Sequence, residues 1–375
     1  MHETNRGPGA GGSGVLLTGA TGFVGSFLLR ALLLKTDAQV HCPVRGATES
    51  AALDRLRGSL AGYGLEDLDR TRIVPVPGDL TAPDLGLGRD GFQSLAERVG
   101  TVVHAGAEVN LVKPARMLEA ANVAGTAAVL RLAAARGAAV HFLSTSEVFG
   151  PAPGSVTEDT APEGRFAAAS GYGQTKRTAE LMVLAAELPT AVHRLDRIVG
   201  DRATGACQPR GDDFWLLART AVAMGALPDT SVNITPVDFA ADALVALAAA
   251  GPDSGAPVTH ICHPRPTPMT DLAIALADFG LRVDVLPLPA WTTRLEKWAD
   301  RPDADPASRL LSVIAGRVLG GSPRFLAPRT NEALAARGLH HPPVDVPTLV
   351  RYVRHLARAG FWAAAEHAGR PVPTA

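Results

Sequence analysis

Tyr172 and Lys176 are the two side chains whose types and spacing point most directly to chemistry. They stand four residues apart, in the segment Tyr-Gly-Gln-Thr-Lys, so a helix places both on one face. The chain has only three tyrosines and four lysines among 375 residues, so this spacing is expected by chance about 0.03 times. A lysine cation beside a phenol favours the phenolate and lowers the tyrosine pKa. We therefore predict that Tyr172 donates a proton to an oxygen that gains negative charge.

Thr145 is the third candidate catalytic residue. It follows a predicted strand at 139–143, in the segment Ser-Thr-Ser-Glu. A hydroxyl at the carboxyl edge of a parallel sheet can hydrogen-bond the same oxygen as the tyrosine. On its own, a threonine at this place is more typical of a strand-end cap. Beside the Tyr172–Lys176 pair, we favour the catalytic role.

A glycine-rich turn indicates that a dinucleotide binds next to these residues. An apolar run at 15–17 leads into Gly19, Gly22 and Gly25, and an apolar helix is predicted at 23–34. Gly19 permits a tight turn, Gly22 lets a pyrophosphate approach the backbone, and Gly25 lets the helix pack on the strand. Amides at the helix N-terminus then face the phosphates, although an ordinary strand-to-helix turn can carry three glycines too. The residues predicted to contact a dinucleotide here are Thr18, Gly19, Thr21, Gly22, Phe23, Val24 and Gly25.

Arg45 indicates which dinucleotide is bound. It stands at the tip of a predicted second strand at 39–44, and no Asp or Glu occurs between residues 39 and 48. An acid at this tip usually holds the ribose hydroxyls of NAD, whereas an arginine pairs with the 2'-phosphate of NADP. Arg55, on the next helix, could add a second charge, and either arginine could instead be a solvated surface residue. We therefore predict NADPH, with Lys176 holding the nicotinamide ribose.

Further cofactor contacts are predicted where two later strands end. Asp79 follows a strand at 72–77 and could bind the adenine amino group or cap a turn, two roles that the sequence leaves open. A strand at 101–104 leads into small residues that would let the dinucleotide cross the sheet edge, and its His104 is interpreted as a packed core histidine. The predicted contacts in these places are Asp79, Leu80, Ala105, Gly106, Ala107 and Asn122, together with Tyr172 and Lys176.

The elements that must position these residues alternate between strands and helices. Strands at 15–17, 39–44, 72–77, 101–104, 139–143 and 191–195 are separated by helical segments, among them 114–135. This order predicts an α/β fold with a doubly wound parallel sheet. We assign residues 1–13 to a flexible lead-in and residues 14–200, with 234–262 returning, to the NADP-binding domain. Residues 201–233 and 263–375, which contain proline-rich joints, are assigned to a smaller, mostly helical substrate-binding domain.

Composition excludes several classes of protein. The formal net charge is −1 and 46% of the residues are apolar, a balance that indicates neither nucleic acid nor a membrane surface as a partner. No apolar run is long enough to span a bilayer. The cysteines Cys42, Cys207 and Cys262 lie far apart, so we expect free thiols, no metal site and a cytoplasmic protein. We also expect a monomer.

Together these motifs resemble the extended short-chain dehydrogenase/reductases over nearly the whole chain. The resemblance is nearest to the thioester reductase domains that end nonribosomal peptide synthetases, polyketide synthases and carboxylic acid reductases. It implies a Rossmann fold and NADPH-dependent release of an acyl or peptidyl thioester from a phosphopantetheinyl carrier protein as an aldehyde, through a thiohemiacetal. A second hydride transfer would give an alcohol. The segments that carry the likeness are 18–25, 43–46, 78–81, 102–110, 122–126, 171–176, 193–200, 236–239 and 359–361.

Two other functions compete with this interpretation. The segment Thr-Ser-Glu-Val at 145–148 resembles the Thr-Asp-Glu-Val of sugar-nucleotide dehydratases and epimerases, but Ser146 stands where their aspartate should be. Those enzymes also commonly recycle NAD, whereas Arg45 favours NADP. The second alternative is a non-catalytic NADP-binding sensor of the same fold. Such a sensor has no use for Tyr172 and Lys176 in register with Thr145.

Overall fold

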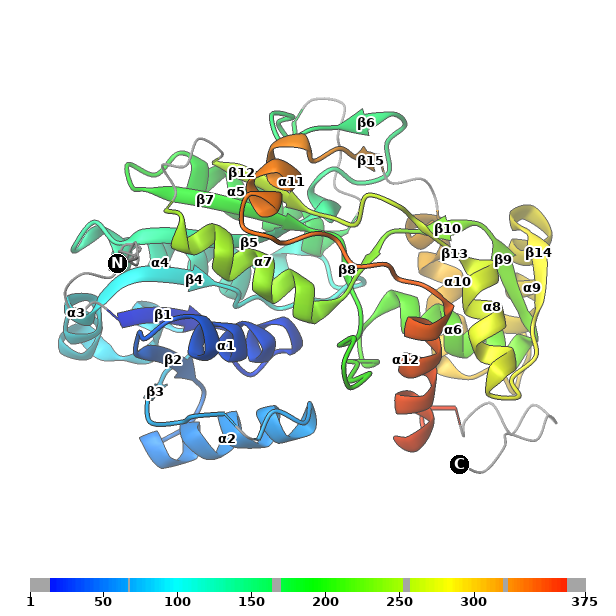
Figure 1. Ribbon diagram of the computed structural model, residues 1–375, viewed down its shortest axis with the longest axis horizontal. Helices are drawn as coiled ribbons and strands as arrows, with labels where there is room; N and C mark the ends of the chain where they lie inside the picture. The colour runs from blue at the N-terminus through cyan, green and yellow to red at the C-terminus, as the bar shows by residue number, and fades with distance from the viewer. Residues whose placement is uncertain (1–13, 67, 164–169, 252–256, 320–322, 363–375) are drawn as a thin grey trace, which may run out of the picture.

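The computed structural model describes residues 14–66, 68–163, 170–251, 257–319 and 323–362 (Figure 1). The predicted lead-in at 1–13 lies outside the described residues. The chain forms two lobes side by side, one built on a central sheet and the other mainly from helices. We call them the sheet lobe and the helical lobe.

The sheet lobe is built on seven parallel strands, which confirms the predicted fold class. Their order is β12-β7-β5-β4-β1-β2-β3, and each neighbouring pair is parallel. Apolar and β-branched residues fill the inner strands, as expected of strands covered on both faces. The strands are β1 (Gly14–Thr18), β2 (Val40–Val44), β3 (Ile73–Pro77), β4 (Val99–His104), β5 (Ala139–Thr145), β7 (Thr190–Leu195) and β12 (Val258–Ile261).

Helices cover both faces of this sheet. The core on one face unites α1 (Phe23–Lys35), α2 (Glu49–Gly62) and α7 (Val237–Ala249). The core on the other face unites α3 (Gly88–Arg98), α4 (Gly125–Ala134) and α5 (Gly171–Leu184). Strand β1 lies between β2 and β4, so the chain winds in one direction through β2 and β3 and then in the other. Parallel α/β sheets bind ligands at such a switch point, beyond the carboxyl ends of the strands.

The helical lobe has its own hydrophobic core, around Trp215, Trp291 and Trp362. Two short strand pairs, β9 (Ala226–Asp229) with β14 (Asp284–Pro287) and β10 (Ser231–Val232) with β13 (Thr267–Pro268), add to its helices. These pairs were not predicted from the sequence. The helices are α6 (Asp213–Met224), α8 (Met269–Asp278), α9 (Leu288–Ala299), α10 (Pro306–Leu319) and α12 (Val346–Arg358).

One helix from the C-terminal third of the chain packs on the sheet lobe. Helix α11 (Pro328–Ala335) contacts α7 and β12, and its Leu334 belongs to the core formed with α1 and α7. Thr330 accepts a hydrogen bond from the amide of His260 and donates one to the buried carboxylate of Glu158. The chain therefore crosses between the lobes again after residue 263. Short strands also link distant segments, β8 (Arg197–Ile198) with β11 (Ile234–Thr235) and β6 (Ser155–Val156) with β15 (Arg324–Phe325).

The segment predicted as one helix at 114–135 is divided. It consists of a 3-10 turn η2 (Ala115–Met117), a π-helical turn η3 (Ala120–Ala124) and then α4. A Cβ atom on Gly125 would lie 2.8 Å from the carbonyl oxygen of Leu80, so this glycine allows the close approach of α4 to the loop after β3. The π-helical turn η3, which precedes Gly125, directs the Asn122 side chain towards the protein interior.

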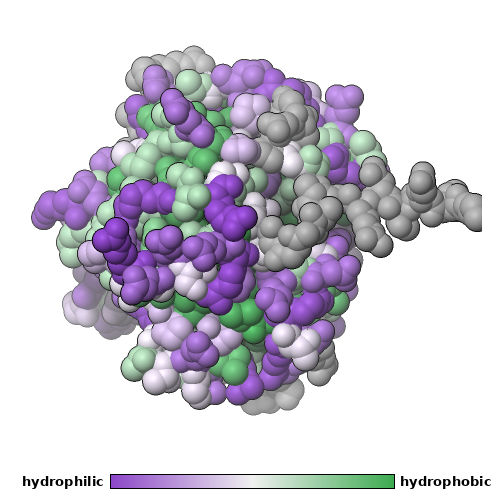
Figure 2. Space-filling model, turned by 90° about the vertical axis from the view of Figure 1, so that its left-hand side faces the viewer, coloured by the Kyte–Doolittle hydropathy of each residue, from purple (hydrophilic) through white to green (hydrophobic). Residues whose placement is uncertain are grey.

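The surface of the sheet lobe turned away from the helical lobe is largely hydrophilic, with small scattered apolar areas (Figure 2). Among the described residues, no helix is both long and apolar enough to cross a membrane.

Buried histidines are an unusual part of the core. His104, His141, His193 and His260 are each no more than 1% exposed. Burial lowers the pKa of His104 and His260 to about 3 and that of His141 to about 4, and it lowers the pKa of His193 as well. Their imidazoles are therefore neutral in the folded protein at neutral pH. His141 and His193 are stacked, with 3.1 Å between Nδ1 of the first and Nε2 of the second.

We expect acid to unfold the protein through these histidines. The unfolded chain binds protons near pH 6.5 and the folded protein does not, so stability is lost as pH falls from 6.5 towards 4. Each fully titrating histidine contributes about 1.4 kcal/mol per pH unit. Burial raises the pKa of Asp196 to about 6 and that of Asp212 to about 7, and these two carboxyls oppose the loss, but the histidines outnumber them.

Urea denaturation at pH 7, 6 and 5 measures this loss of stability. The variant His141→Gln should have a shallower dependence on pH, whereas the same change at the exposed His340 should leave the dependence as it is. Equal free energies of unfolding at all three pH values would contradict the prediction.

Candidate active site

The glycine turn has the close contacts predicted for it. Gly19 has a φ of +75°, and a Cβ atom there would lie 2.8 Å from the backbone of Ala105. A Cβ atom on Gly25 would lie 2.0 Å from the carbonyl oxygen of Gly19, so only glycine fits. A Cβ atom on Gly22 would lie 3.3 Å from the carbonyl oxygen of Gly19, which is also a tight contact. Helix α1 starts after Gly22 with no side-chain cap and no acid in its first turn. These features fit a dinucleotide phosphate.

The opposite wall of the switch point is held by a buried chain of hydrogen bonds. The amide of Gly106 donates to Oγ1 of Thr18, which lies 2.6 Å from Nδ1 of His104. Nε2 of His104 lies 3.0 Å from Oγ1 of Thr126, which itself donates to the carbonyl of Asn122. Since Thr126 uses its proton on that carbonyl, the histidine must donate from Nε2 and accept at Nδ1. This network places His104 in the core and confirms the interpretation made from the sequence.

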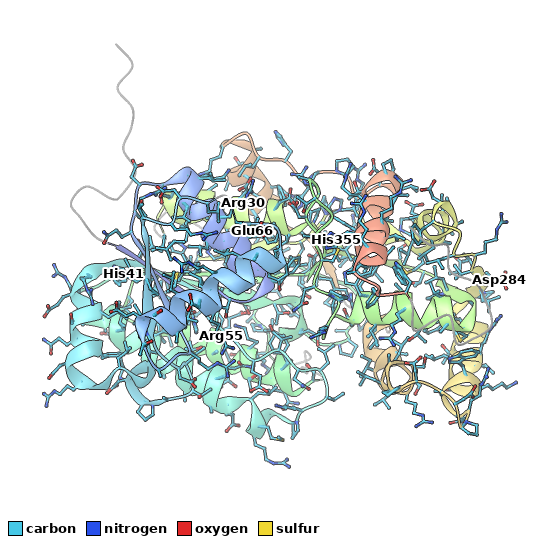
Figure 3. All side chains as sticks on the ribbon, turned by 90° about the horizontal axis from the view of Figure 1, so that it is seen from below. Arg30, His41, Arg55, Glu66, Asp284 and His355 are labelled. Atoms are coloured by element: carbon cyan, nitrogen blue, oxygen red, sulfur yellow. The ribbon has the colours of Figure 1, made fainter. Side chains whose placement is uncertain are left out.

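Asp79 forms a turn beside the two candidate phosphate-binding arginines. Its Oδ1 accepts from the amide and the hydroxyl of Thr81, at 2.9 and 2.8 Å. These bonds lower the pKa of Asp79, and the charges of Arg45 and Arg55 lower it further. Both arginines are exposed, and neither forms an ion pair with another described residue. Figure 3 shows Arg55 on α2, at the surface of the sheet lobe. The two cations therefore lie on the side of the switch point formed by β2 and β3.

Helix α5 begins beside the end of β5. Ser170 caps the helix by accepting from the amide of Gly173, at 2.9 Å, and its hydroxyl also reaches Oε2 of Glu147, at 3.3 Å. A Cβ atom on Gly171 would lie 2.4 Å from the carbonyl of Lys113, so the loop after β4 lies directly against this end of the helix. The capped end presents Tyr172 at the carboxyl edge of the sheet.

Lys176 is bound to β5, and the pKa of the Tyr172 phenol is not lowered beside it. Its Nζ donates to the carbonyl of Leu143 at 2.6 Å and lies 3.8 Å from the ring centroid of Phe142. Burial, and then the charge of Glu147, raise the pKa of Tyr172. The predicted lowering of the tyrosine pKa by the lysine is therefore wrong for this arrangement, because burial and a carboxylate outweigh the cation. Burial lowers the pKa of Lys176 itself to about 7.

Thr145 is the last residue of β5, which runs two residues further than predicted. Its Oγ1 accepts from the amide of Glu147 at 3.2 Å, as a strand-end cap does. A hydroxyl can accept and donate at once, so this bond leaves the Thr145 proton for another acceptor. The structure therefore gives Thr145 the capping role and leaves its O–H group suited to the catalytic one.

Asn122 holds parts of the site together. Its Oδ1 accepts from the amide of Glu108 at 2.7 Å, and its Nδ2 donates to the Glu108 carbonyl and to Oγ1 of Thr175. Asn122 is 2% exposed, so its amide is committed to protein partners. We therefore give it the role of connecting the loop after β4 to α5, in place of the predicted direct contact with a cofactor.

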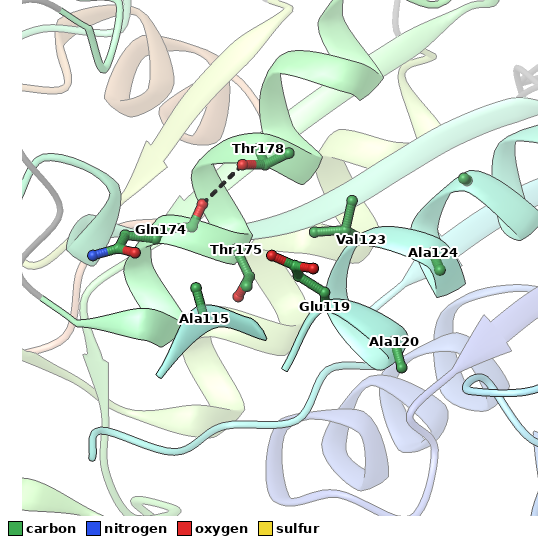
Figure 4. Close-up of a pocket in the computed structure, with 9 residues that line it drawn as sticks. Ala115, Glu119, Ala120, Val123, Ala124, Gln174, Thr175 and Thr178 are labelled. Atoms are coloured by element: carbon green, nitrogen blue, oxygen red, sulfur yellow. Dashed lines mark hydrogen bonds between the residues drawn. The ribbon is translucent and has the colours of Figure 1, made fainter. Parts of the chain in front are cut away.

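A pocket of about 460 Å³ lies behind α5, between that helix and the segment formed by η2, η3 and α4 (Figure 4). Gln174, Thr175 and Thr178 line its α5 side. At about 100° per residue, Gln174 and Thr178 lie on the face of α5 opposite Lys176, and Thr175 lies on the flank between that face and Tyr172. The pocket is therefore separate from the place where Tyr172 and Lys176 meet β5.

Sequence reasoning missed a buried group of charges next to Lys176. Glu180 and Arg194 form an ion pair of 2.6 Å, and Ser144, the residue before Thr145, donates to the same carboxylate. The available signal was the spacing, since Glu180 follows Lys176 by four residues and Tyr172 by eight. Within the described part of the chain, no group of three or more His, Cys, Asp or Glu residues could hold a metal.

Comparison with known structures identifies similar domains. The terminal R domain from the myxalamid PKS-NRPS biosynthetic pathway has a TM-score of 0.84 and 33% identity, over 93% of this chain and 91% of that one. The reductase (R) domain of a nonribosomal peptide synthetase from Mycobacterium tuberculosis has a TM-score of 0.80 and 26% identity, over 94% and 93% of the two chains.

Comparison with characterised sequences identifies the same kind of protein as the comparison with known structures. The profile of the family described as "Male sterility protein" matches residues 17–244. A linear gramicidin synthase from Brevibacillus parabrevis is 37% identical over 361 residues, which are 92% of this chain and 7% of that protein. The isonitrile lipopeptide synthase of Streptomyces coeruleorubidus is 37% identical over 376 residues, 92% of this chain and 24% of that protein. The chain thus spans a small part of these relatives.

The parallel sheet, the glycine turn and the Tyr-Lys pair define an extended short-chain reductase that uses a nicotinamide cofactor. Within that class the chain belongs to the reductase (R) domains of nonribosomal peptide and polyketide synthases, and the resemblance seen in the sequence is confirmed. A UDP-glucuronic acid 4-epimerase from Bacillus cereus is 18% identical with a TM-score of 0.61, a likeness that shows the shared fold alone.

Proposed function

We propose that this chain reduces an acyl or peptidyl thioester, carried on the phosphopantetheine arm of a carrier protein, and releases it as an aldehyde. The observation that supports the proposal is that Lys176 on α5 bonds to β5 two residues before Thr145, while Tyr172, one turn earlier on α5, feels the charge of Glu147 just after Thr145. These residues lie on the carboxyl side of a parallel sheet with a switch point. The named relatives include two peptide synthases, and a thiolation-reductase di-domain of an archaeal synthetase shares the fold.

The proposed roles of the chain's residues follow from their contacts. Thr145 and Tyr172 donate hydrogen bonds to the thioester oxygen as it gains charge, and Tyr172 then transfers its proton. Lys176 binds the ribose hydroxyls and holds the helix face in place. When bound at the switch point, the reduced nicotinamide supplies the hydride. A protonated tyrosine suits a proton donor, and its raised pKa keeps it protonated at neutral pH.

The cysteines give no support to a covalent acyl-enzyme. Cys42, Cys207 and Cys262 are free, as predicted from their spacing, and the structure buries all three. Burial raises the pKa of Cys42 to about 12 and raises those of the other two as well. Since the thiolate is the nucleophile, direct transfer of hydride to the thioester fits this chain better.

We further propose that the cofactor is NADPH. The support is the pair of exposed cations, Arg45 at the end of β2 and Arg55 on α2, and the influence of both on Asp79. Their side of the switch point is where the adenosine ribose of a dinucleotide lies. Asp79, whose Oδ1 is engaged with Thr81, would use its other oxygen for the adenine amino group.

The release reaction tests the proposed function. An acyl-loaded carrier protein is mixed with NADPH, the absorbance of the reduced nicotinamide is followed, and the released product is identified by mass spectrometry. We expect NADPH oxidation that depends on the thioester, with an aldehyde or the derived alcohol as product. Turnover of a sugar nucleotide in its place would support the dehydratase or epimerase alternative, and NADPH binding without turnover would support a sensor.

A further inference from the structure

Three successive turns of α5 present Tyr172, Lys176 and Glu180 on one face. Residues at positions i, i+4 and i+8 of a helix lie one above another. The proposed function uses the first two and has no use for the third. Glu180 is nevertheless 0% exposed, which is rare for a glutamate unless it is paired.

The Glu180 carboxylate is fixed on both oxygens. Oε1 accepts from Nε and Nη2 of Arg194, at 3.1 and 2.6 Å, and Oε2 accepts from the hydroxyl of Ser144. Arg194, which is 1% exposed, uses its other nitrogen on the Thr160 carbonyl and on Nε2 of His260, both at 3.1 Å. The ion pair, formed between α5 and β7, is therefore held by three further segments of the sheet lobe: β5, the segment at Thr160, and β12.

Lys176 needs a negative charge nearby, and its own contacts supply none. Its ammonium touches a carbonyl and an aromatic ring, neither of which carries a full charge, and the residue is 3% exposed. The titratable groups with which it interacts are Glu180 on α5 and His104 on β4; Tyr172 stands one turn before it on α5, and Arg194 on β7 pairs with Glu180. Because His104 and Tyr172 are neutral at pH 7, Glu180 provides the negative charge among these described neighbours.

We propose that Glu180 is a positioning residue whose buried carboxylate, held by Arg194 and Ser144, keeps Lys176 in its charged form against β5. The proposal rests on the function proposed above for Lys176. Burial lowers the pKa of Lys176 and Glu180 opposes that effect. Without the carboxylate, the buried ammonium of Lys176 would lose the charge one helical turn away, and the buried guanidinium of Arg194 would lose its ion-pair partner.

Titration of Lys176 by NMR tests the proposal directly. The protein is made with ¹³Cε-labelled lysine and studied without cofactor; its four lysines give few signals, and Lys176→Met identifies the one of interest. The Glu180→Gln variant should lower the titration midpoint of Lys176 by on the order of one pH unit. An unchanged midpoint would overturn the proposal.

Two further variants guard against a folding defect. Because Glu180→Gln leaves Arg194 unbalanced in the core, the double variant Glu180→Gln, Arg194→Met removes both charges. In this double variant the titration midpoint of Lys176 should still lie below its midpoint in the native protein. A midpoint equal to the native one would also overturn the proposal. In the matched control Ser144→Ala the carboxylate keeps its charge, so the midpoint should move far less than in Glu180→Gln.

The pH profile of kcat/KM provides a second readout. If Lys176 acts as a cation, the alkaline limb of the profile should move to lower pH in Glu180→Gln by the same amount as the NMR midpoint, with activity recovered at more acid pH. A purely structural role would lower activity alike at every pH. Absence of thioester-dependent turnover in the native protein would count against the proposed function and would leave the NMR result as the test of Glu180.

Discussion

Tyr172→Phe is expected to lower kcat for thioester reduction by about 100-fold or more, because the ring is kept and the proton donor is lost. The affinity for NADPH, followed by fluorescence titration, should change little, since Lys176 and the glycine turn remain. The raised pKa of Tyr172 predicts that the phenol stays protonated well above pH 7. Loss of kcat with retained binding would identify a group that acts on the reacting oxygen.

The matched control for this variant is Tyr63→Phe. Tyr63 packs against Phe23 and Phe27 on the other side of the glycine turn, with centroid distances of 5.3 and 6.2 Å, and these ring contacts survive the change. The turnover of the Tyr63→Phe variant should equal that of the native protein. Native turnover in Tyr172→Phe would rule out a proton donor at that position.

Arg45→Ala is expected to weaken NADPH binding by about tenfold to 100-fold and to change NADH binding about twofold at most. A hydrogen bond to a charged partner contributes about 1.5–3 kcal/mol, and NADH has no 2'-phosphate to lose. The dissociation constants of both cofactors, measured by fluorescence at one ionic strength, give the ratio that decides the assignment.

The control for Arg45 is Arg57→Ala. Arg57 is exposed on α2, as Arg55 is, but it pairs with Asp54 at 3.4 Å. Its removal should leave the ratio of NADPH to NADH affinity unchanged. An equal loss of both cofactors in Arg45→Ala would remove the phosphate assignment, and Arg55→Ala would then show whether the second arginine carries the preference.

The sequence predicted the parts of this protein that follow from local rules. Alternating strands and helices led to the parallel sheet, and a Cβ atom at Gly19 or Gly25 would collide with backbone atoms. The interpretation of His104 as a core residue was also correct, because an imidazole within a buried strand finds partners such as Thr18 and Thr126.

Contacts between residues far apart in the chain could not be predicted in the same way. The commitment of Asn122 to Glu108 and Thr175 depends on a π-helical turn, and the raised pKa of Tyr172 depends on the position of Glu147 after β5. The partners of Glu180 come from other segments of the chain. The periodicity of a segment predicts which face of its helix or strand a residue occupies. It does not predict which other segment packs against that face.

The packing of α11 on α7 and β12 has a practical consequence for anyone who shortens this chain. A truncated protein that stops ahead of residue 328 would uncover apolar surface on α7 and would deprive the buried Glu158 of both groups that Thr330 donates to it, at 3.0 and 3.1 Å. We therefore expect that the sheet lobe will not fold from a chain truncated before α11, because α11 at residues 328–335 is part of its packing.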